Sequence, residues 1–236
     1  MTTVLLVRHG LTAMTGPRLA GWTPGLSLDD RGRQQAAAVA ERLRPLPLAA
    51  IVSSPLDRCL ETAGAVLEGR PLELAVDDRI GECRYGDWTG KELKVLAKDP
   101  LWKVVQAHPS AAVFPGPEGE PLAETSRRAV SAMRDWDARL AAEHGPDAVW
   151  VACSHGDVIK AIIADALGLH LDAFQRISVD PCSVSVVRYT ELRPFIVRVN
   201  DTGGGVADLQ PPKRKGRRRR AASSDATVGG GTGGSA

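Results

Sequence analysis

The sequence predicts an α/β protein in which helices cover both faces of a mostly parallel sheet, followed by a disordered C-terminal tail. Short runs rich in β-branched residues alternate along the chain with segments whose apolar residues recur at helical spacing. Strands that alternate with helices favour parallel pairing, because each helix returns the chain to the same edge of the sheet. Six segments are expected to be strands: residues 4–7, 50–53, 72–76, 148–152, 183–189 and 195–199.

Three helices are marked by their ends and by the spacing of their apolar residues. The first is expected to begin at Ser54-Pro55, since serine caps helix N-termini and proline fits the first helical position, and to end at Gly69. The second is expected to end at Gly145-Pro146 and the third at Gly168. Their apolar residues recur at spacings of three and four: Leu56, Leu60, Ala63 and Leu67; Met133, Trp136 and Leu140; Ile159, Ile162, Ile163, Ala166 and Leu167.

The composition divides the chain into one folded domain and a tail. With 236 residues, of which 43% are hydrophobic and 25% charged, the chain suits a single globular domain. We expect this domain to span residues 1–202. From Gly203 onward the chain is rich in glycine, serine and basic residues that a core does not bury, so residues 203–236 are expected to be disordered.

Charge is distributed unevenly between the domain and the tail. The net charge is +2, but the run KRKGRRRR at 213–220 holds seven of the 30 basic residues. Only one of the 28 acidic residues, Asp225, lies beyond residue 212, so the folded part is mildly acidic. The basic run predicts at most a weak, nonspecific contact with nucleic acid, and we expect it mainly to keep the tail in solvent.

Cysteine usage and hydropathy argue against several classes of protein. The four cysteines form no close pair, so neither a zinc site nor a disulfide framework is expected, and no cofactor motif is present. Reduced thiols that fill core positions are expected instead. The longest apolar runs fall far short of the ~20 residues of a membrane span, so no membrane contact is expected. Because the first strand follows the N-terminal Met directly, a cytoplasmic protein is expected.

Basic side chains occur where three of the predicted strands end. Arg8 and His9 follow the first strand, His155 follows the strand at 148–152, and Arg58 lies in the first turn after the strand at 50–53. Parallel strands end at one edge of a sheet, so we expect these side chains to meet in one pocket. Two guanidinium groups and two imidazoles suit an anion, and a phosphate in particular.

Phosphoryl chemistry explains this choice of residue types. Arginine binds phosphate oxygens bidentately, and a neutral imidazole can form a covalent intermediate. A glycine follows each histidine, which would let the backbone approach a ligand closely. Taken singly, each basic residue has an ordinary structural explanation, and the combination at the strand ends favours a site. The other histidines, His108, His144 and His170, are expected at the surface.

Five motifs in order resemble those of the histidine phosphatase superfamily, in its phosphoglycerate-mutase-like branch. The resemblance covers residues 4 to about 200 and implies that branch's fold. It implies that His9 is the residue that becomes phosphorylated and that Glu82 protonates the leaving oxygen. It also implies that His155 belongs to the same catalytic group. Further residues match positions in the phosphate pocket or near the substrate: Arg8, Arg58, Thr12, Gly21 and Gly156. The motifs are LLVRHGLTA, LSLDDRGRQQA, VSSPLDRCLETA, GECRYGDWTGKEL and ACSHGDVIKAI.

The sequence departs from the family at positions that bear on the reaction. Thr15 occupies a position at which the family usually has asparagine. Phosphoglycerate mutases of this type carry an arginine directly after the acid and an arginine pair in the lid, where this chain has Cys83 and no arginine between Arg84 and Arg127. Residues 99–125 are expected to form the lid, which either closes over a substrate or packs onto the body. Trp22 and Trp88 either flank the pocket or fill the core.

Three functions are compatible with these patterns. The favoured one is a metal-independent phosphatase that hydrolyses a small-molecule phosphomonoester through phospho-His9. The second is a cofactor-dependent phosphomutase of the phosphoglycerate mutase type. The third is a non-catalytic phosphate-binding protein whose basic tail contacts nucleic acid or an anionic surface. From the residues alone Glu82 could equally be a surface glutamate in a polar loop, and the natural substrate and a homo-oligomeric state stay open.

Overall fold

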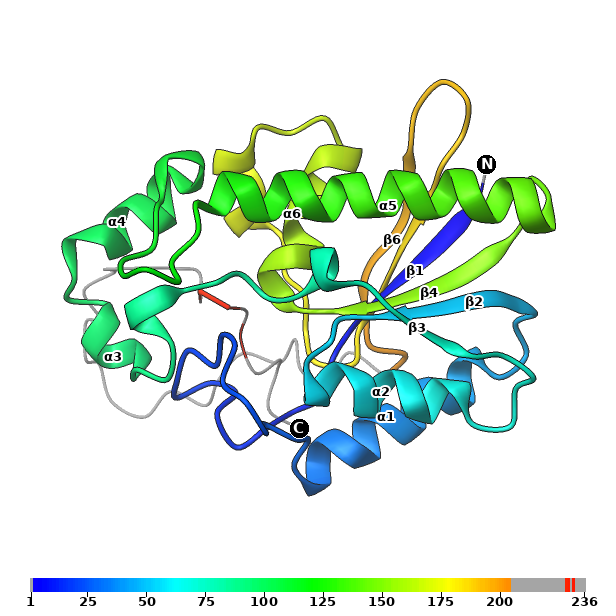
Figure 1. Ribbon diagram of the computed structural model, residues 1–236, viewed down its shortest axis with the longest axis horizontal. Coiled ribbons are helices and arrows are strands. Elements are labelled where there is room, and N and C mark those ends of the chain that lie inside the picture. The colour runs from blue at the N-terminus through cyan, green and yellow to red at the C-terminus, as the bar shows by residue number, and fades with distance from the viewer. Residues whose placement is uncertain (1, 205–227, 230, 232–236) are drawn as a thin grey trace.

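The computed structural model describes residues 2–204, 228, 229 and 231, and within them a single six-stranded sheet forms the centre of the molecule (Figure 1). The strand order is β3-β2-β4-β1-β5-β6. The strands from β3 to β1 run parallel, whereas β5 is antiparallel to β1 and β6 is antiparallel to β5. The six predicted strands are confirmed, with these bounds: β1 Thr3–Arg8, β2 Leu48–Ser53, β3 Leu74–Val76, β4 Val149–Ser154, β5 Val184–Arg188 and β6 Phe195–Asp201.

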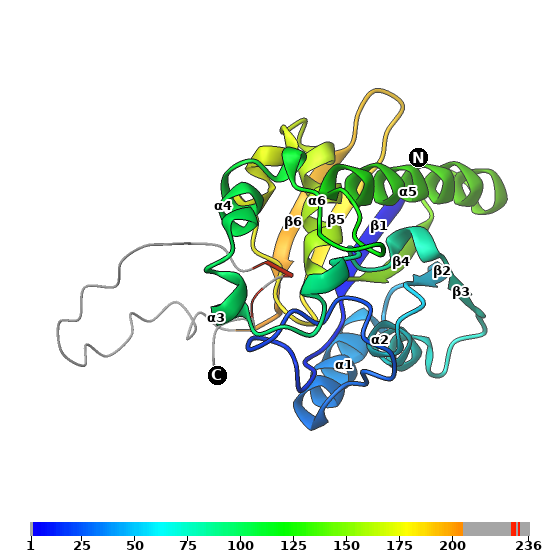
Figure 2. The same ribbon diagram turned by 60° about the vertical axis from the view of Figure 1, so that its left-hand side comes forward.

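Helices cover both faces of this sheet, as predicted (Figures 1 and 2). Helices α1 and α2 pack together on one face, and α5 and α6 pack together on the other. Strand β1 contributes side chains to the hydrophobic cores on both faces of the sheet, because Val4 and Leu6 lie in one core and Leu5 and Val7 lie in the other. The helices are α1 Asp30–Leu43, α2 Asp57–Leu67, α3 Leu93–Leu96, α4 Pro100–Ala107, α5 Leu122–His144 and α6 Gly156–Ala166, with 3-10 turns η1 Asp78–Ile80, η2 Gly86–Trp88, η3 Pro109–Ala111 and η4 Leu171–Arg176.

The helix ends follow from local chemistry, with one correction to the sequence-based prediction. Helix α5 ends at Gly145, which has φ +88°, and Gly168 follows α6 with φ +67°. Helix α2 begins at Asp57, two residues later than expected, and its N-cap Leu56 supplies no side-chain cap. Ser54 is therefore not the N-cap residue: its hydroxyl accepts from the Leu56 N–H at 3.4 Å and also contacts a distant histidine, as described below.

Residues 99–125 pack onto the body of the protein as an apolar layer. Trp102, Val105 and Phe114 are buried in the core beside α5. The ring centroid of Trp88 lies 6.2 Å from that of Trp102 and 5.5 Å from that of Phe114. Trp88 is therefore a core residue, and of the two expectations for the lid the packed one describes this structure.

The carboxyl ends of three parallel strands lie side by side and position the functional residues. Arg8 at the end of β1 is in register with Ser154 at the end of β4, and Ser53 of β2 is in register with Cys153. The next residues continue the pattern, since the His9 N–H donates to the Ser154 carbonyl at 3.0 Å and the Ser54 N–H donates to the Cys153 carbonyl at 3.0 Å. The sequence-predicted convergence of strand ends is thus built into the backbone.

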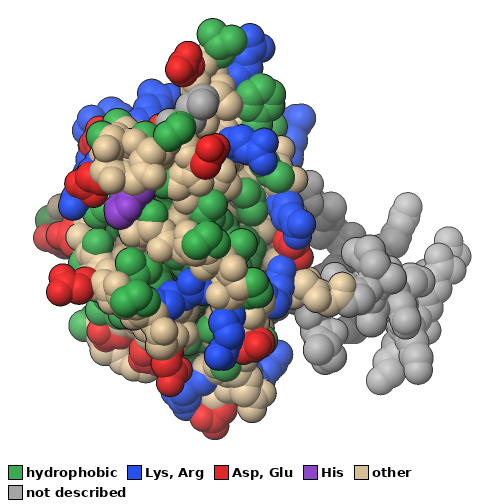
Figure 3. Space-filling view, turned by 90° about the vertical axis from the view of Figure 1, so that its right-hand side faces the viewer, with side chains coloured by type: hydrophobic (Ala, Val, Ile, Leu, Met, Phe, Trp, Pro, Cys, Tyr) green, Lys and Arg blue, Asp and Glu red, His purple; other side chains and the backbone are tan. Residues whose placement is uncertain are grey.

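The surface and the cysteines are those of an ordinary globular chain. The face shown in Figure 3 carries basic and acidic side chains interspersed.

All four cysteines are free and buried, as expected: Cys59, Cys83, Cys153 and Cys182. Across the described ranges, none of the helices combines the length and apolarity that crossing a membrane requires. The basic run 213–220 and most of the predicted tail lie outside the described residues.

Candidate active site

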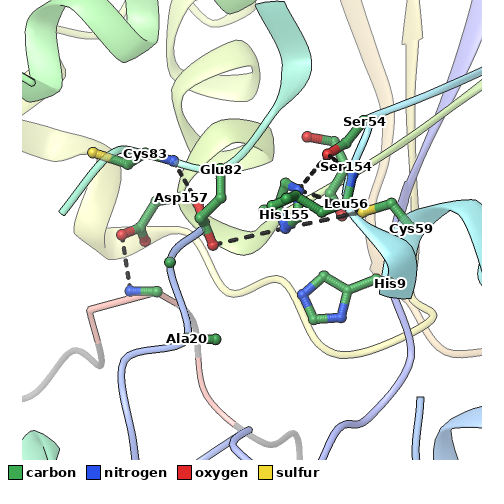
Figure 4. A network of polar contacts seen from close by, with 12 residues as sticks. His9, Ala20, Ser54, Leu56, Cys59, Glu82, Cys83, Ser154, His155 and Asp157 are labelled. Carbon is green, nitrogen blue, oxygen red and sulfur yellow. Dashed lines mark hydrogen bonds and ion pairs between the residues drawn. The ribbon is translucent and has the colours of Figure 1, made fainter. Parts of the chain in front are cut away.

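Two arginines and two histidines meet at the carboxyl edge of the sheet, where Figure 4 shows His9 and His155 close together. The Arg58 side chain, from the first turn of α2, joins them: its Nε donates to His9 Nε2 at 3.2 Å and its Nη2 donates to His155 Nδ1 at 3.1 Å. The two imidazole centroids are 5.2 Å apart. His9, Arg58 and His155 therefore form one cluster, as the strand-end pattern predicted.

The hydrogen bonds of His9 determine which ring nitrogen is free to react. Its Nδ1 lies 2.7 Å from the Gly10 carbonyl oxygen, which can only accept, so Nδ1 carries the proton. Its Nε2 carries no proton and accepts from Arg58 Nε, so a phosphorus atom that bonds to Nε2 has to take the place of this hydrogen bond. Burial, followed by the charges of Arg58 and Arg8, holds the pKa of His9 well below its usual range. The imidazole is therefore neutral at physiological pH and is a potential nucleophile.

The ring of His155 is held by Ser54, which the sequence predicts to be a helix N-cap. Because His155 Nδ1 accepts from Arg58, its Nε2–H donates to Ser54 Oγ at 2.7 Å. The pKa of His155 is also well below its usual range, through burial and then through Arg58 and His9. The sequence contained the signal for Ser54, which directly follows β2 as the histidines follow their strands, but its position before Pro55 was interpreted as a helix cap.

A loop glycine orients Arg58 from the opposite side. The carbonyl of Gly21 accepts from Arg58 Nη2 at 2.8 Å. Gly21 has φ +51°, and a Cβ there would lie 2.7 Å from Thr89 Oγ1, so this position favours glycine strongly. The resemblance placed Gly21 near the substrate, and the contact with Arg58 explains why it lies there.

Arg8 completes the cationic part of the site and has hydrogen-bonding capacity to spare. Its side chain is 1% exposed, and its Nη1 donates to the Val179 carbonyl at 2.8 Å. Among the described residues, Arg8 Nε and Arg58 Nη1 are buried without a hydrogen-bond partner. Buried donors without partners are costly, and a bound anion would satisfy them.

Glu82 is buried in the site, which excludes the surface position that its polar surroundings in the sequence left open. It is 3% exposed, and its Oε2 lies 3.8 Å from His155 Nδ1, as Figure 4 shows. Its Oε1 accepts from the Cys83 N–H at 3.0 Å. Burial and then the charge of Asp157 raise the pKa of Glu82 to about 7, against the opposing effect of Arg58. Glu82 can therefore hold a proton near neutral pH and release it.

Two side chains hold the backbone around Glu82. Trp22 Nε1 donates to the Glu82 carbonyl at 2.6 Å, and Arg128 Nη2 donates to the same oxygen at 2.9 Å. Arg128 Nη1 also donates to the carbonyls of Arg79 and Gly81, at 2.6 and 2.8 Å. Trp22 thus lies at the site, which was one of the two expectations for this residue. No local pattern marked Arg128, because its role depends on how α5 packs against a loop some 46 residues away.

Thr12 and Thr15 form a hydroxyl pair beside His9. Their Oγ1 atoms are 3.0 Å apart, and Thr15 Oγ1 accepts from the Thr12 N–H at 3.1 Å. Thr15, which replaces the asparagine usual in the family, lines a cavity together with Arg8, His9 and Glu82. Thr12 supports that cavity through Thr15. A polar side chain is therefore retained at the position of the replacement.

The glycines that follow the two histidines differ in their surroundings. A Cβ on Gly10 would lie 2.6 Å from the Gly32 carbonyl oxygen of α1. Close packing against α1 therefore requires glycine at position 10, and the approach of a ligand to this backbone stays a prediction. Gly156 is the first residue of α6 and is buried, so this predicted pocket residue places a helix N-terminus directly after His155.

Asp157 and Tyr85 form a second buried layer next to Glu82. Asp157 Oδ2 accepts from the Tyr85 hydroxyl at 2.9 Å, and its Oδ1 lies 3.3 Å from Lys160 Nζ. All three are buried, with Asp157 only 1% exposed. Lys160 thus gives the buried Asp157 carboxylate an ion-pair partner. Within the described part of the chain, no three acidic, histidine or cysteine residues cluster in a way that could hold a metal ion.

Known proteins share this architecture. Residues 4–202 match the family profile described as "Histidine phosphatase superfamily (branch 1)". A Cronobacter sakazakii protein named "Probable phosphoglycerate mutase GpmB" is 30% identical over 217 residues, which cover 90% of this chain and 97% of that protein. The solved structure of Bacillus stearothermophilus YhfR has a TM-score of 0.74 and 27% identity, and covers 85% of this chain and 98% of its own. The mycobacterial glucosyl-3-phosphoglycerate phosphatase has a TM-score of 0.72 and 26% identity over 84% of this chain and 98% of its own.

Proposed function

Since the chain belongs to the histidine phosphatase superfamily, branch 1, we propose that it hydrolyses small-molecule phosphomonoesters through a phosphohistidine at His9, without a metal ion. One observation carries the proposal. The unprotonated Nε2 of a neutral His9 accepts from Arg58 Nε at 3.2 Å, beside buried guanidinium N–H groups that have no partner among the described residues. A nucleophile and the donors for phosphoryl oxygens therefore share one pocket.

Binding of the substrate would use the positive charge of the two arginines. A phosphomonoester dianion presents three oxygens, which accept charge-assisted hydrogen bonds from Arg8 and Arg58. These groups do not have to move far, because the Val179 and Gly21 carbonyls already fix the two side chains. Such fixed donors stabilise the charge that builds up on the phosphoryl oxygens in the transition state.

The first chemical step transfers the phosphoryl group to His9. The lone pair of His9 Nε2 forms a bond to phosphorus while the bond between phosphorus and the ester oxygen breaks. The proton of Glu82 passes to the leaving oxygen, which departs as an alcohol. The Nδ1–H bond to the Gly10 carbonyl stabilises the positive charge that the ring acquires.

The second step hydrolyses the phosphohistidine with the same two side chains. Glu82, now a carboxylate, accepts a proton from a water molecule as its oxygen attacks phosphorus. The bond between phosphorus and His9 Nε2 breaks, the electron pair returns to Nε2, and inorganic phosphate leaves. A pKa of about 7 suits Glu82 to both roles, as acid and then as base.

A phosphomutase is the second candidate, and the name of the Cronobacter sakazakii relative favours it. Other observations favour hydrolysis. Cys83, at the position where mutases of this type carry an arginine, is buried in the apolar core. Lys91, Lys94, Lys98 and Lys103 are all exposed. A mutase must hold a second acidic group of its bisphosphate. Neither Cys83 nor the four exposed lysines supply a cation to the pocket.

The products formed distinguish the two candidates. The enzyme is incubated with 3-phosphoglycerate and bisphosphoglycerate, and in parallel with p-nitrophenyl phosphate, and free phosphate and isomerised product are measured. We expect phosphate release to dominate and to be lost in His9→Ala. His144→Ala, which removes an exposed imidazole, should leave turnover unchanged. Isomerisation faster than phosphate release would show the chain to be a mutase.

A further inference from the structure

The C-terminal segment, formed by Val228, Gly229 and Gly231, lies inside the active site. The carbonyl of Gly231 accepts from Arg8 Nη1 at 2.6 Å, and the carbonyl of Gly229 lies 3.5 Å from Arg8 Nη2. The Gly229 N–H donates to Asp157 Oδ2 at 2.8 Å, and Figure 4 shows Asp157 beside Glu82. In Figures 1 and 2 this is the red segment near the carboxyl ends of the strands. More than 220 residues thus separate Arg8 from the groups that it contacts.

The segment is anchored by apolar packing as well as by hydrogen bonds. Val228 is 1% exposed and belongs to the same core cluster as Leu19 and Tyr85. Gly229 has φ +77°, and a Cβ there would lie 2.9 Å from Leu19 Cδ1. Valine and glycine at these two positions therefore fit the site, one by filling an apolar recess and the other by its backbone conformation.

The contacts of the segment overlap with those proposed for the substrate. Val228 and Gly229 line the same cavity as Arg8, His9 and Glu82. The Gly231 carbonyl oxygen occupies Arg8 Nη1, a donor that a phosphoryl oxygen would use. The peptide carbonyls are neutral and leave Arg8 Nε and Arg58 Nη1 without partners among the described residues, whereas a dianion would satisfy them. Segment and phosphate therefore exclude one another, and phosphate has the stronger electrostatic attraction.

We propose that the C-terminal segment is an intramolecular competitor of the substrate, docked on Arg8 and Asp157, which must leave before a phosphomonoester binds. The proposal goes beyond the catalytic function and gives the end of the chain a role. Because the segment is covalently attached, its concentration at the site depends on the length of the connecting chain and not on the protein concentration. Asp157 is a docking residue in this arrangement, since it receives the segment's N–H.

Competition of this kind has a defined kinetic signature. When the site is open in only a fraction of the molecules, the apparent KM is the intrinsic value divided by that fraction, so about 10% open molecules raise it about tenfold. The kcat does not change, because the substrate-bound enzyme is the same whether or not the segment was docked before. A structural role for the segment would instead change kcat or stability.

Gly229→Pro in the full-length chain tests the proposal. Proline removes the N–H that binds Asp157 and cannot adopt φ +77°, so the segment can no longer dock, while the side chains of Arg8, His9, Arg58 and Glu82 are left unchanged. We expect the KM for p-nitrophenyl phosphate to fall about fivefold or more, with kcat within twofold of the wild-type value. Gly204→Pro, an exposed glycine with open space around it, is the matched control and should leave KM unchanged. An equal KM in Gly229→Pro and the wild type would overturn the proposal.

Two further measurements keep this test separate from the proposed catalytic function. Calorimetric titration with inorganic phosphate requires no turnover, and the affinity should rise in Gly229→Pro by the same factor by which KM falls. In NMR hydrogen exchange, the Gly229 amide should be protected in the wild type and lose that protection at saturating phosphate. An amide that exchanges equally fast in both conditions, without protection, would refute the docking even if the enzyme turns over normally.

Discussion

At the scale of single residues, the proposed mechanism requires His9 and His155 to be neutral and Glu82 to be protonated. Arg58 helps to keep both histidines neutral. It donates a hydrogen bond to each imidazole, and its charge lowers the pKa of each. Asp157 acts in the opposite sense on Glu82, because its charge raises the pKa of that carboxyl group. The cations therefore favour the free base form of the nucleophile, and the anion favours the acid form of the proton donor.

The pKa of Glu82 predicts the alkaline side of the pH profile. The free enzyme needs protonated Glu82 for the first step, so kcat/KM should fall as pH rises through about 7. The low pKa of His9 predicts that protonation of the nucleophile limits the rate only at a pH well below 6.5. In Glu82→Gln the alkaline fall should vanish and kcat should drop about 10²–10⁴-fold. A pH profile of Glu82→Gln with the wild-type alkaline limb would contradict the assignment.

Ser54 offers a second test at this scale. Ser54→Ala removes the acceptor for the Nε2–H of His155, which then loses the bond that fixes its tautomer. We expect kcat/KM to fall about tenfold, and the thermal midpoint of unfolding to fall as well, because the buried Nε2–H of His155 is left without an acceptor, at a cost of about 1–3 kcal/mol. Ser110→Ala, outside the site, serves as the control. Wild-type kinetics for Ser54→Ala would show that His155 does not need this partner.

At the scale of strands and helices, the fold brings these side chains together in one place. Strands β1, β2 and β4 end in register, and the residues that follow them, together with the first turn of α2, supply most of the phosphate pocket. Helix α5 contributes from the other side of the molecule, because Arg128 binds three carbonyls of the segment that leads to Glu82. The position of the acid therefore depends on the packing of a helix that contains no catalytic residue.

Arg128→Ala tests this coupling between a helix and a loop. The change removes three carbonyl contacts and leaves Glu120, its half-buried ion-pair partner, without a cation, so we expect a loss of about 3 kcal/mol in the free energy of unfolding. Because the loop carries Glu82, kcat should also fall. The control is Arg127→Ala, the neighbouring residue with an exposed ion pair to Glu124, which should change neither quantity measurably. Equal urea denaturation curves and kinetics for the two variants would contradict the role of Arg128.

How far sequence predicts such a molecule depends on the range of the interactions involved. Strands and helix ends follow from local periodicity and from glycines such as Gly145, and all six strands were predicted close to their observed positions. The convergence of His9, Arg58 and His155 followed from a topological rule, that parallel strands end at one edge. These features need only local pattern and chain direction.

The residues that were missed act over long distances in the sequence. Arg128 and Asp157 have no signature in the chain, since their partners lie about 46 and 72 residues away. Ser54 was misassigned because a serine before a proline is a good helix cap by itself, and only the fold brings it to His155. The docking of Val228 likewise depends on a recess that exists only in the folded protein.

For the whole molecule, the structure joins a phosphate pocket to a chain end that occupies it. Arg8, His9 and Glu82 are buried, and residues 15, 16 and 18–20 and the C-terminal segment line the same cavity. Burial excludes water, which strengthens the contacts of Arg8 and Arg58 with a charged substrate. The same burial requires that the segment departs when a substrate arrives, so access to His9 and the chemistry at His9 are linked.

Trapping of the phosphorylated enzyme tests the central claim most directly. The wild type is mixed with a phosphomonoester, quenched within one turnover under alkaline conditions, digested and sequenced by mass spectrometry. We predict an acid-labile phosphoryl group on His9 of the wild type, accumulating further in Glu82→Gln with a good leaving group, and none in His9→Ala. Turnover with no phosphate on His9, or a phosphoryl group on another residue of the pocket, would contradict the account.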